Sequence, residues 1–176
     1  KEQKVAIAER IYTLATEKHG IHPEDLVFDL LTFTVGSGDT EYHTAAIETI
    51  EAIREFHALH PEVGFVLGVS NISFGLAKHA REYLNSVFLH HCVEAGLSMA
   101  IVNVKNTLPM HKISNIDKKV CEDLLFNRRE EGDPLFKFIS HFEGVVENKD
   151  ESDVAYLAMS TKEKISTLLI DGDKER

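Results

Sequence analysis

The sequence predicts an α/β fold made of parallel βα units, the C-terminal part of a TIM (β/α)8 barrel, followed by a helical linker. Three nearly continuous apolar runs read as parallel strands that are buried on both faces. Segments of helical period precede and follow these runs, so that helices and strands alternate along the chain. A complete barrel has ~250 residues and this repeat begins on a helix, so we expect the 176 residues to contain only part of one.

Each element of this repeat has its own local signal. We expect helices over residues 4–18, 40–57 and 79–95, and strands over residues 26–28, 64–69 and 99–103. Apolar side chains recur at helical spacing in every one of the three helices. Asp39 or Thr40 is expected to cap the second helix, His60-Pro61 to end it, and Gly96 to end the third.

The pattern changes after residue 103. We expect a loop over residues 105–114, helices over 117–129, 135–142 and 161–170, and a charged linker over 147–153. Gly132-Asp-Pro134 marks a break between the first two of these helices. This part of the chain is typical of a connector that leads into another domain.

The charge balance argues against several classes of partner. Acidic residues outnumber basic ones 29 to 19, for a net charge of -10, so we expect no nucleic-acid surface and no anionic-membrane surface. No apolar run reaches the ~18 residues of a membrane helix. Cys92 and Cys121 form no C-x-x-C pair and are expected to be reduced, structural thiols of a cytoplasmic protein. The ten histidines follow no zinc-ligand spacing, so we predict no metal site.

Asp29 directly follows the first apolar run, which places its side chain at the end of a strand. A carboxylate there can accept two parallel hydrogen bonds from an N–H/NH2 edge. A pterin or a guanine ring presents such an edge, and so does an arginine. The alternative is structural, with Asp29 capping a helix or pairing with an internal arginine.

Asn71 follows the second strand and offers both a donor and an acceptor. Gly68, at the end of that strand, permits close approach of a ligand. An amide in this place can hydrogen-bond a ring nitrogen whose charge changes during a reaction. The alternative is a loop asparagine that supports its own turn, and for Asn103 after the third strand we favour that structural role.

Arg81 lies at the beginning of the helix after the second strand, where it could reach an anionic tail of a ligand. A solvated helical arginine is the alternative. His90 and His91 are adjacent on one helix and cannot share a face toward one metal ion.

Several motifs occur together in one order. They are Phe28-Asp-Leu-Leu-Thr-Phe33, Gly68-Val-Ser-Asn-Ile-Ser-Phe-Gly75, Leu84-Asn-Ser-Val-Phe-Leu89, Gly96–Asn103, Asp123-Leu-Leu-Phe-Asn-Arg-Arg129 and Leu169-Ile-Asp-Gly-Asp-Lys174. As a set they resemble the pterin-binding, dihydropteroate synthase-like barrel of the cobalamin-dependent methionine synthase family, with its exit segment. The resemblance divides the chain into barrel units over 1–113, a helical linker over 114–157 and the beginning of a cobalamin-module cap helix over 158–176.

The resemblance implies methyl transfer from N5 of methyltetrahydrofolate to cob(I)alamin. It implies that Asp29 holds the pterin amide and amino group and that Asn71, as the catalytic residue, hydrogen-bonds the N5 region. Gly68, Ser70 and Arg81 are carried over as further pterin-binding positions. The family often has proline after the aspartate, whereas this chain has leucine.

Folate and the remaining domains of the full-length enzyme are the expected partners. Cobalamin is expected in the full-length protein but not on this part, and we expect the isolated chain to be inactive. An incomplete barrel exposes strand edges, which predicts a homodimer. The alternatives are another pterin-binding barrel, either dihydropteroate synthase-like or a corrinoid methyltransferase, and a non-catalytic interdomain module.

Overall fold

The computed structural model describes residues 1–143 and 160–161. The chain divides into two compact units, Lys1–Gly144 and Val145–Arg176, and the account below concerns the first. The linker expected over 147–153 lies outside the described residues, as does the helix expected over 161–170 after its first residue. The domain boundaries at 113/114 and 157/158 stay predictions.

Three parallel strands form one sheet in the order β1-β2-β3. The strands are β1 (Val27–Phe28), β2 (Gly64–Gly68) and β3 (Met99–Ile101). Phe28 pairs with Phe65 in the register of the first two strands, and Gly68 pairs with Ile101 in that of the last two. All three predicted strands are therefore present, and their parallel order confirms the predicted βα units.

Five α-helices accompany the sheet among the described residues. They are α1 (Glu2–Thr13), α2 (Ala45–Leu59), α3 (Lys78–Ala95), α4 (Asn115–Leu125) and α5 (Pro134–Glu143). The predicted cap of the second helix is wrong, because residues Thr40–Tyr42 form a separate 3₁₀ turn and Thr44 precedes α2. The fourth helix ends before the predicted residue 129, since Asn127 takes a left-handed conformation with φ 48°.

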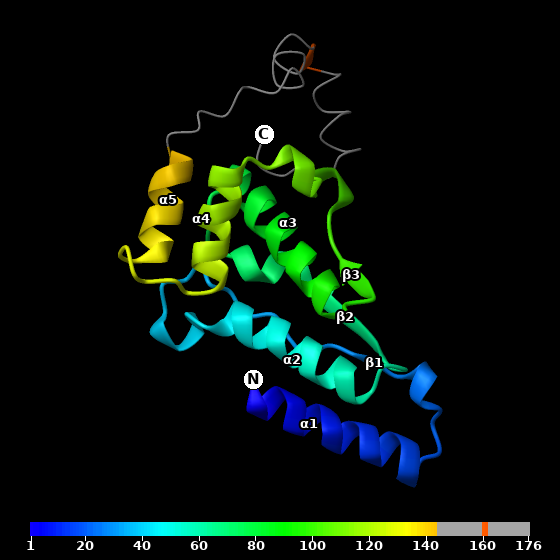
Figure 1. The fold of residues 1–176 in the computed structure, drawn as a ribbon. Coiled ribbons are helices and arrows are strands. Elements are labelled where there is room, and N and C mark those ends of the chain that lie inside the picture. The colour runs from blue at the N-terminus through cyan, green and yellow to red at the C-terminus, as the bar shows by residue number, and fades with distance from the viewer. Residues whose placement is uncertain (144–159, 162–176) are drawn as a thin grey trace. The chain divides into compact units, whose positions relative to one another are not determined.

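Helices α2 and α3 pack against one face of the sheet, with α1 beyond α2 and with α4 and α5 beyond α3 (Figure 1). The aromatic rings of Phe28, Phe56 and Phe65 meet on the covered face, with ring centroids 4.9 Å apart between Phe28 and Phe56. The other face carries Val27, whose side chain contacts the Cβ position of Gly64, and this face is open in the described residues. The sheet is thus half covered.

Gly96 ends α3 as predicted, with φ 118° in the left-handed region. It also lets α3 approach α2, because a Cβ at this position would lie 2.7 Å from the ring of His57. One glycine therefore serves both the helix end and the contact between the two helices.

Histidine contacts join α3, α4 and α5. His91 Nε2 lies 3.2 Å from Glu122 on α4, and His141 Nε2 on α5 lies 2.6 Å from Asp117 on α4. His79 on α3 contacts the main-chain oxygen of Phe142 at 2.8 Å. These contacts keep α4 and α5 in the same compact unit as the sheet.

Both cysteines are free and buried, which confirms the prediction of structural thiols. Burial raises the pKa of Cys92, and burial together with Asp117 and Glu122 raises the pKa of Cys121 to about 12. Both side chains are therefore neutral thiols near neutral pH.

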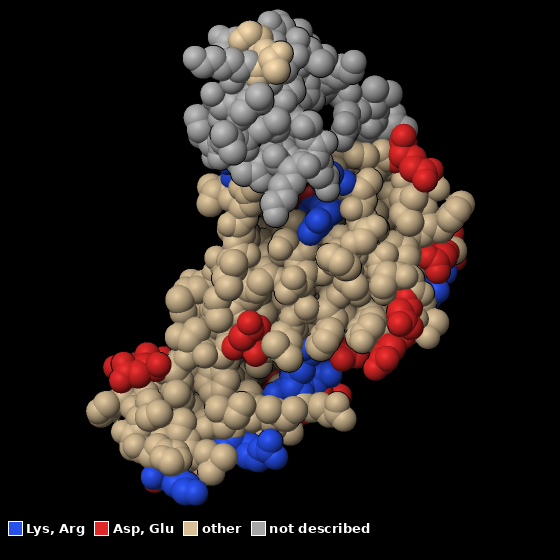
Figure 2. All heavy atoms as spheres, turned by 180° about the vertical axis from the view of Figure 1, so that it is seen from behind, with Lys and Arg blue, Asp and Glu red and all other residues tan. Residues whose placement is uncertain are grey.

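On the face of the described residues shown in Figure 2, lysine and arginine side chains lie in small separate groups and form no continuous basic patch. No helix of the described part of the chain combines the length and the apolar character needed to cross a membrane.

Candidate functional site

The carboxyl ends of the three parallel strands meet at one edge of the sheet. Asp29 is the first residue after β1, and Asn71 and Asn103 lie three and two residues after the ends of β2 and β3. Ligands of α/β barrels bind at this edge, because the loops that leave the strands converge there. The candidate site is therefore built on the loops after β1 and β2.

The Asp29 carboxylate is exposed and turns back on its own loop. Its Oδ1 accepts a hydrogen bond from the main-chain N–H of Leu31 at 2.8 Å. It neither caps a helix nor pairs with an arginine among the described residues. Its Oδ2 accepts no hydrogen bond from the described part of the chain, so the carboxylate can still accept from a ligand.

The Asn71 side chain lies in a 3₁₀ turn, Val69–Ser73, directly after β2. A Cβ added at Gly68 would lie 3.1 Å from Nδ2 of Asn71, so the glycine gives the amide its space. The amide is exposed and makes no hydrogen bond to the described residues. Its donor and its acceptor are thus available to a ligand.

The loops after β1 and β2 are joined by hydrogen bonds. Thr34 Oγ1 donates to the main-chain oxygen of Phe74 at 2.7 Å, and Val35 N–H donates to that of Ile72 at 3.0 Å. Gly36 is required at the end of this contact, because a Cβ there would lie 2.8 Å from the Phe74 oxygen. The segments that carry Asp29 and Asn71 are therefore held as one unit.

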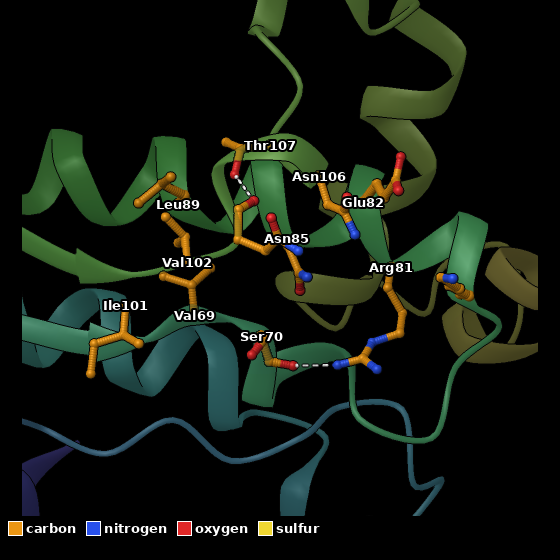
Figure 3. Close-up of a pocket in the computed structure, with 12 residues that line it drawn as sticks. Val69, Ser70, Arg81, Glu82, Asn85, Leu89, Ile101, Val102, Asn106 and Thr107 are labelled. Carbon is orange, nitrogen blue, oxygen red and sulfur yellow. Dashed lines mark hydrogen bonds between the residues drawn. The ribbon is translucent and has the colours of Figure 1, made fainter. Parts of the chain in front are cut away.

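Arg81 lies in the first turns of α3 and reaches back to the loop after β2. Its Nε donates to Oγ of Ser73 at 3.0 Å and its Nη2 donates to the main-chain oxygen of Ser70 at 3.2 Å. Figure 3 shows the bond from Arg81 to Ser70 beside a hollow of about 420 Å³ between α3, the end of β2 and the loop after β3. Ser70 and Arg81 line this hollow, together with Lys78, Asn85 and Asn106.

The structure does not bring all the predicted residues into one hollow. Asp29 lines a second hollow of about 410 Å³ between α1, α2 and the loop after β1. Gly68 and Asn71 line neither hollow. Gly68, Ser70, Asn71 and Arg81 share one loop and the helix behind it, whereas Asp29 belongs to the neighbouring loop.

Asn103 has the structural role that its pattern favoured. Its Oδ1 accepts a hydrogen bond from the N–H of Lys105 at 3.1 Å and begins the 3₁₀ turn Val104–Asn106. This local turn also ends β3 at Ile101, two residues before the predicted end.

Two polar residues that lie near the site were not identified from the sequence. Asn85 lies four residues after Arg81, so helical spacing could have identified it, and its buried Oδ1 has no hydrogen-bond partner in the described residues. Lys4 on α1 contacts the loop after β1, which is 26 residues away in sequence. No local pattern signals a contact of this kind.

No group of three or more histidine, cysteine, aspartate or glutamate side chains could hold a metal ion in the part of the chain that the structure describes. The polar groups at the sheet edge are a carboxylate, an amide and a guanidinium. Such groups recognise an organic ligand through hydrogen bonds.

The chain belongs to the pterin-binding enzyme family, whose sequence profile matches residues 1–103. This match covers all three strands and the loops that carry Asp29 and Asn71. The predicted fold class, part of a (β/α)8 barrel with parallel βα units, is therefore confirmed.

Among individual proteins, the chain is similar to the methionine synthases of Mycobacterium tuberculosis and Mycobacterium leprae. The identities are 44% and 40%, and each alignment covers 98% of this chain and 15% of the relative. The resemblance to the methionine synthase family is thereby confirmed. The chain spans about 15% of the length of these relatives.

Proposed function

We propose that this chain forms part of a folate-binding site in a protein that transfers the N5 methyl group of methyltetrahydrofolate to cob(I)alamin, for methionine synthesis from homocysteine. The observation that carries the proposal is the pair of free polar groups, on Asp29 and Asn71, at the strand ends of a pterin-binding enzyme. The similarity to two methionine synthases over nearly the whole chain supports this particular reaction.

Asp29 is the residue that we assign to the pterin ring. The pterin presents an N–H and an NH2 group on one edge, and a carboxylate can accept from both. The bond from Leu31 N–H to Oδ1 fixes the carboxylate while leaving Oδ2 and further lone pairs for the ring. The role of Asp29 is therefore to bind and orient the pterin.

Asn71 is the residue that we assign to catalysis. During transfer the bond between the methyl carbon and N5 breaks, and the electron pair of that bond stays on N5. Without a proton, N5 would leave as a nitrogen anion, which is a poor leaving group. N5 therefore has to gain a proton, so that a neutral amine leaves. An amide that strengthens its hydrogen bond as N5 changes charge stabilises the transition state more than the ground state.

Gly68, Ser70 and Arg81 complete the proposed set of pterin-binding positions. Gly68 provides the space for the Asn71 amide, and Arg81 ties the main chain of Ser70 to α3. The guanidinium also borders the hollow of Figure 3. An anionic tail of the ligand could be attracted there by Arg81 and Lys78.

Cobalamin, the proposed methyl acceptor, is assigned to another part of the whole protein, and the remaining domains are the proposed partners of this chain. We expect the chain by itself to be inactive. A cytoplasmic location is proposed as well, because both cysteines are free thiols, as is typical of a reducing compartment.

A second pterin-binding activity, such as that of a dihydropteroate synthase-like barrel or another corrinoid methyltransferase, is the competing proposal. The similarity to methionine synthases continues past residue 103, where the match to the pterin-binding family ends. The segment after the barrel units therefore favours the methionine synthase reaction.

The test uses the full-length protein that contains this chain. We expect Asn71→Ala to slow a single turnover of methyl transfer by about 100-fold, with the fold intact. Asp29→Ala is expected to weaken methyltetrahydrofolate binding in calorimetry by about 1.5–3 kcal/mol. Asn115→Ala is the matched control, because this exposed asparagine lies on α4 and lines neither hollow.

Two results would contradict the proposal. Full methyl-transfer activity of Asn71→Ala would favour the alternative, in which the chain is a non-catalytic interdomain module. Failure of the unmodified full-length protein to bind methyltetrahydrofolate would exclude the folate site itself.

A further inference from the structure

The loop that carries Asp29 contains a leucine in an unfavourable backbone conformation. Leu31 has φ 60°, in the left-handed region that residues other than glycine, asparagine and aspartate rarely adopt. Its side chain is 57% exposed, so burial of the side chain does not hold it in this conformation. Leu31 N–H donates to the Asp29 carboxylate, so the orientation of the peptide group between Leu30 and Leu31, whose oxygen is that of Leu30, sets the direction of that carboxylate.

Lys4 on α1 holds this loop through its main chain. Its Nζ donates to the main-chain oxygen of Leu30 at 2.6 Å and to that of Leu31 at 2.8 Å. The same ammonium group lies 5.2 Å from the ring centroid of Phe33, within range of a cation–π interaction. One side chain thus contacts three residues of the loop after Asp29, namely Leu30, Leu31 and Phe33.

Other contacts show where the loop is anchored. Thr49 Oγ1 on α2 donates to the same Leu31 oxygen at 3.2 Å, and the ring of Phe33 stacks on Tyr42 at 5.5 Å. Lys4 is partly buried; burial lowers its pKa, while the carboxylates of Glu48 and Asp29 act in the opposite direction. Its hydrogen bonds go to carbonyl groups, so the Asp29 carboxylate is left free of an ion pair with Lys4 in the described residues.

We propose that Lys4 is a positioning residue for the folate site, which holds the left-handed turn at Leu31 and thereby directs the Asp29 carboxylate toward the pterin ring. The inference rests on the proposed function. Lys4 acts through the main chain of this loop, and its side chain borders the same hollow as Asp29. The strength of folate binding should then depend on Lys4 only as long as Asp29 is present.

The test is a double-mutant cycle in the full-length protein, with methyltetrahydrofolate affinity measured by calorimetry. We expect Lys4→Met to weaken binding about 10-fold, because methionine keeps the apolar stem but has no donors for the two carbonyls. In an Asp29→Ala background, Lys4→Met should cause no further loss. Lys4→Arg, which keeps the donors, should retain most of the affinity.

The matched control is Lys18→Met, which changes an exposed lysine just after α1 that makes no contact with the loop. A second variant tests the backbone directly, because asparagine tolerates the left-handed region better than leucine. Adding Leu31→Asn to Lys4→Met should restore binding. Thermal unfolding of every variant separates these effects from a general loss of stability.

Hydrogen exchange of the 26–34 segment provides a measurement that needs no ligand. Lys4→Met should accelerate exchange of the Leu31 amide, and Lys18→Met should not. Unchanged exchange in Lys4→Met would overturn the positioning role, as would an equal loss of affinity with and without Asp29. If the unmodified protein fails to bind folate, the proposed function is wrong, and the exchange result alone decides whether Lys4 holds the turn.

Discussion

At the scale of single residues, Gly68 and Asn71 form a matched pair. The glycine has an ordinary negative φ of -77°, so its backbone conformation alone does not require glycine. The reason for it is the Asn71 amide, whose Nδ2 would lie 3.1 Å from a Cβ at position 68. The sequence predicts close approach of a ligand at Gly68, which stays a prediction. In the structure the group next to this position is a side chain of the same loop.

We predict that Gly68→Ala weakens folate binding by about 10-fold while changing thermal stability little, because the added methyl displaces the Asn71 amide. Gly64→Ala is the control on the same strand, since its Cβ would meet Val27, Met99 and Ser98 at 3.3–3.4 Å and no site residue. Calorimetry measures the methyltetrahydrofolate affinity of both variants in the full-length protein. Equal affinities in the two variants would show that the position of the amide does not matter.

At the scale of elements, the beginning of α5 was predicted accurately from Gly132-Asp-Pro134. Pro134 occupies the first helical position, where a missing N–H costs nothing. Asp133 precedes it and caps the helix, because its Oδ1 accepts from the N–H groups of Leu135 at 2.9 Å and Phe136 at 3.1 Å. These signals lie within four residues, which is why they can be read from the sequence.

Asp133 also predicts a dependence of stability on pH. The hydrogen bond from Phe136 N–H is the largest cause that holds the pKa of Asp133 below its usual value, opposed by desolvation. Since the pKa is lower in the folded state, the stabilisation is complete at neutral pH and is lost as the pH falls below about 4. Asp133→Ala should cost about 1 kcal/mol at neutral pH and progressively less as the pH falls below about 4 and the carboxylate becomes protonated.

Urea unfolding at pH 7 and near pH 3 measures this effect. Asp133→Asn is the control, because asparagine also caps helices but does not titrate. The asparagine variant should lose the part of the pH dependence that the carboxylate supplies. If Asp133→Ala lowers the free energy of unfolding equally at pH 7 and near pH 3, the charge of Asp133 does not contribute to the cap.

At the scale of the whole molecule, the described sheet is covered on one face and open on the other. Met99 and Ile101 of β3 are 45% and 67% exposed, and Val27 of β1 is 50% exposed. An exposed strand with unpaired main-chain groups and apolar side chains favours pairing with another chain. The surface of this unit therefore supports the prediction of a homodimer when it is studied alone.

We predict that the isolated chain is a dimer at micromolar concentration by light scattering. Ile101→Lys should shift it toward the monomer, because a charge on the strand edge opposes pairing. Ile116→Lys is a close control, since Ile116 on α4 is 68% exposed and lies away from the sheet. A compact monomer of the unmodified chain would contradict the prediction.

The sequence by itself determined the strands, the helix ends marked by glycine and proline, and the candidates Asp29 and Asn71. These features depend on signals within a few residues, such as apolar period, turn residues and a polar side chain after an apolar run. The dependence on local signals also explains why the predicted cap at Asp39 or Thr40 was wrong. A local signal does not show at which residue a helix begins to pack against the sheet.

Only the tertiary structure decided how the site residues are held and which hollows they line. The contact of Lys4 with Leu30 and Leu31 joins residues 26 and 27 positions apart, and the bond from Thr34 to Phe74 joins residues 40 positions apart. The left-handed turn at Leu31 has no residue that favours it in isolation. Such features arise when distant segments satisfy one another's hydrogen bonds, and that condition is met only in the folded chain.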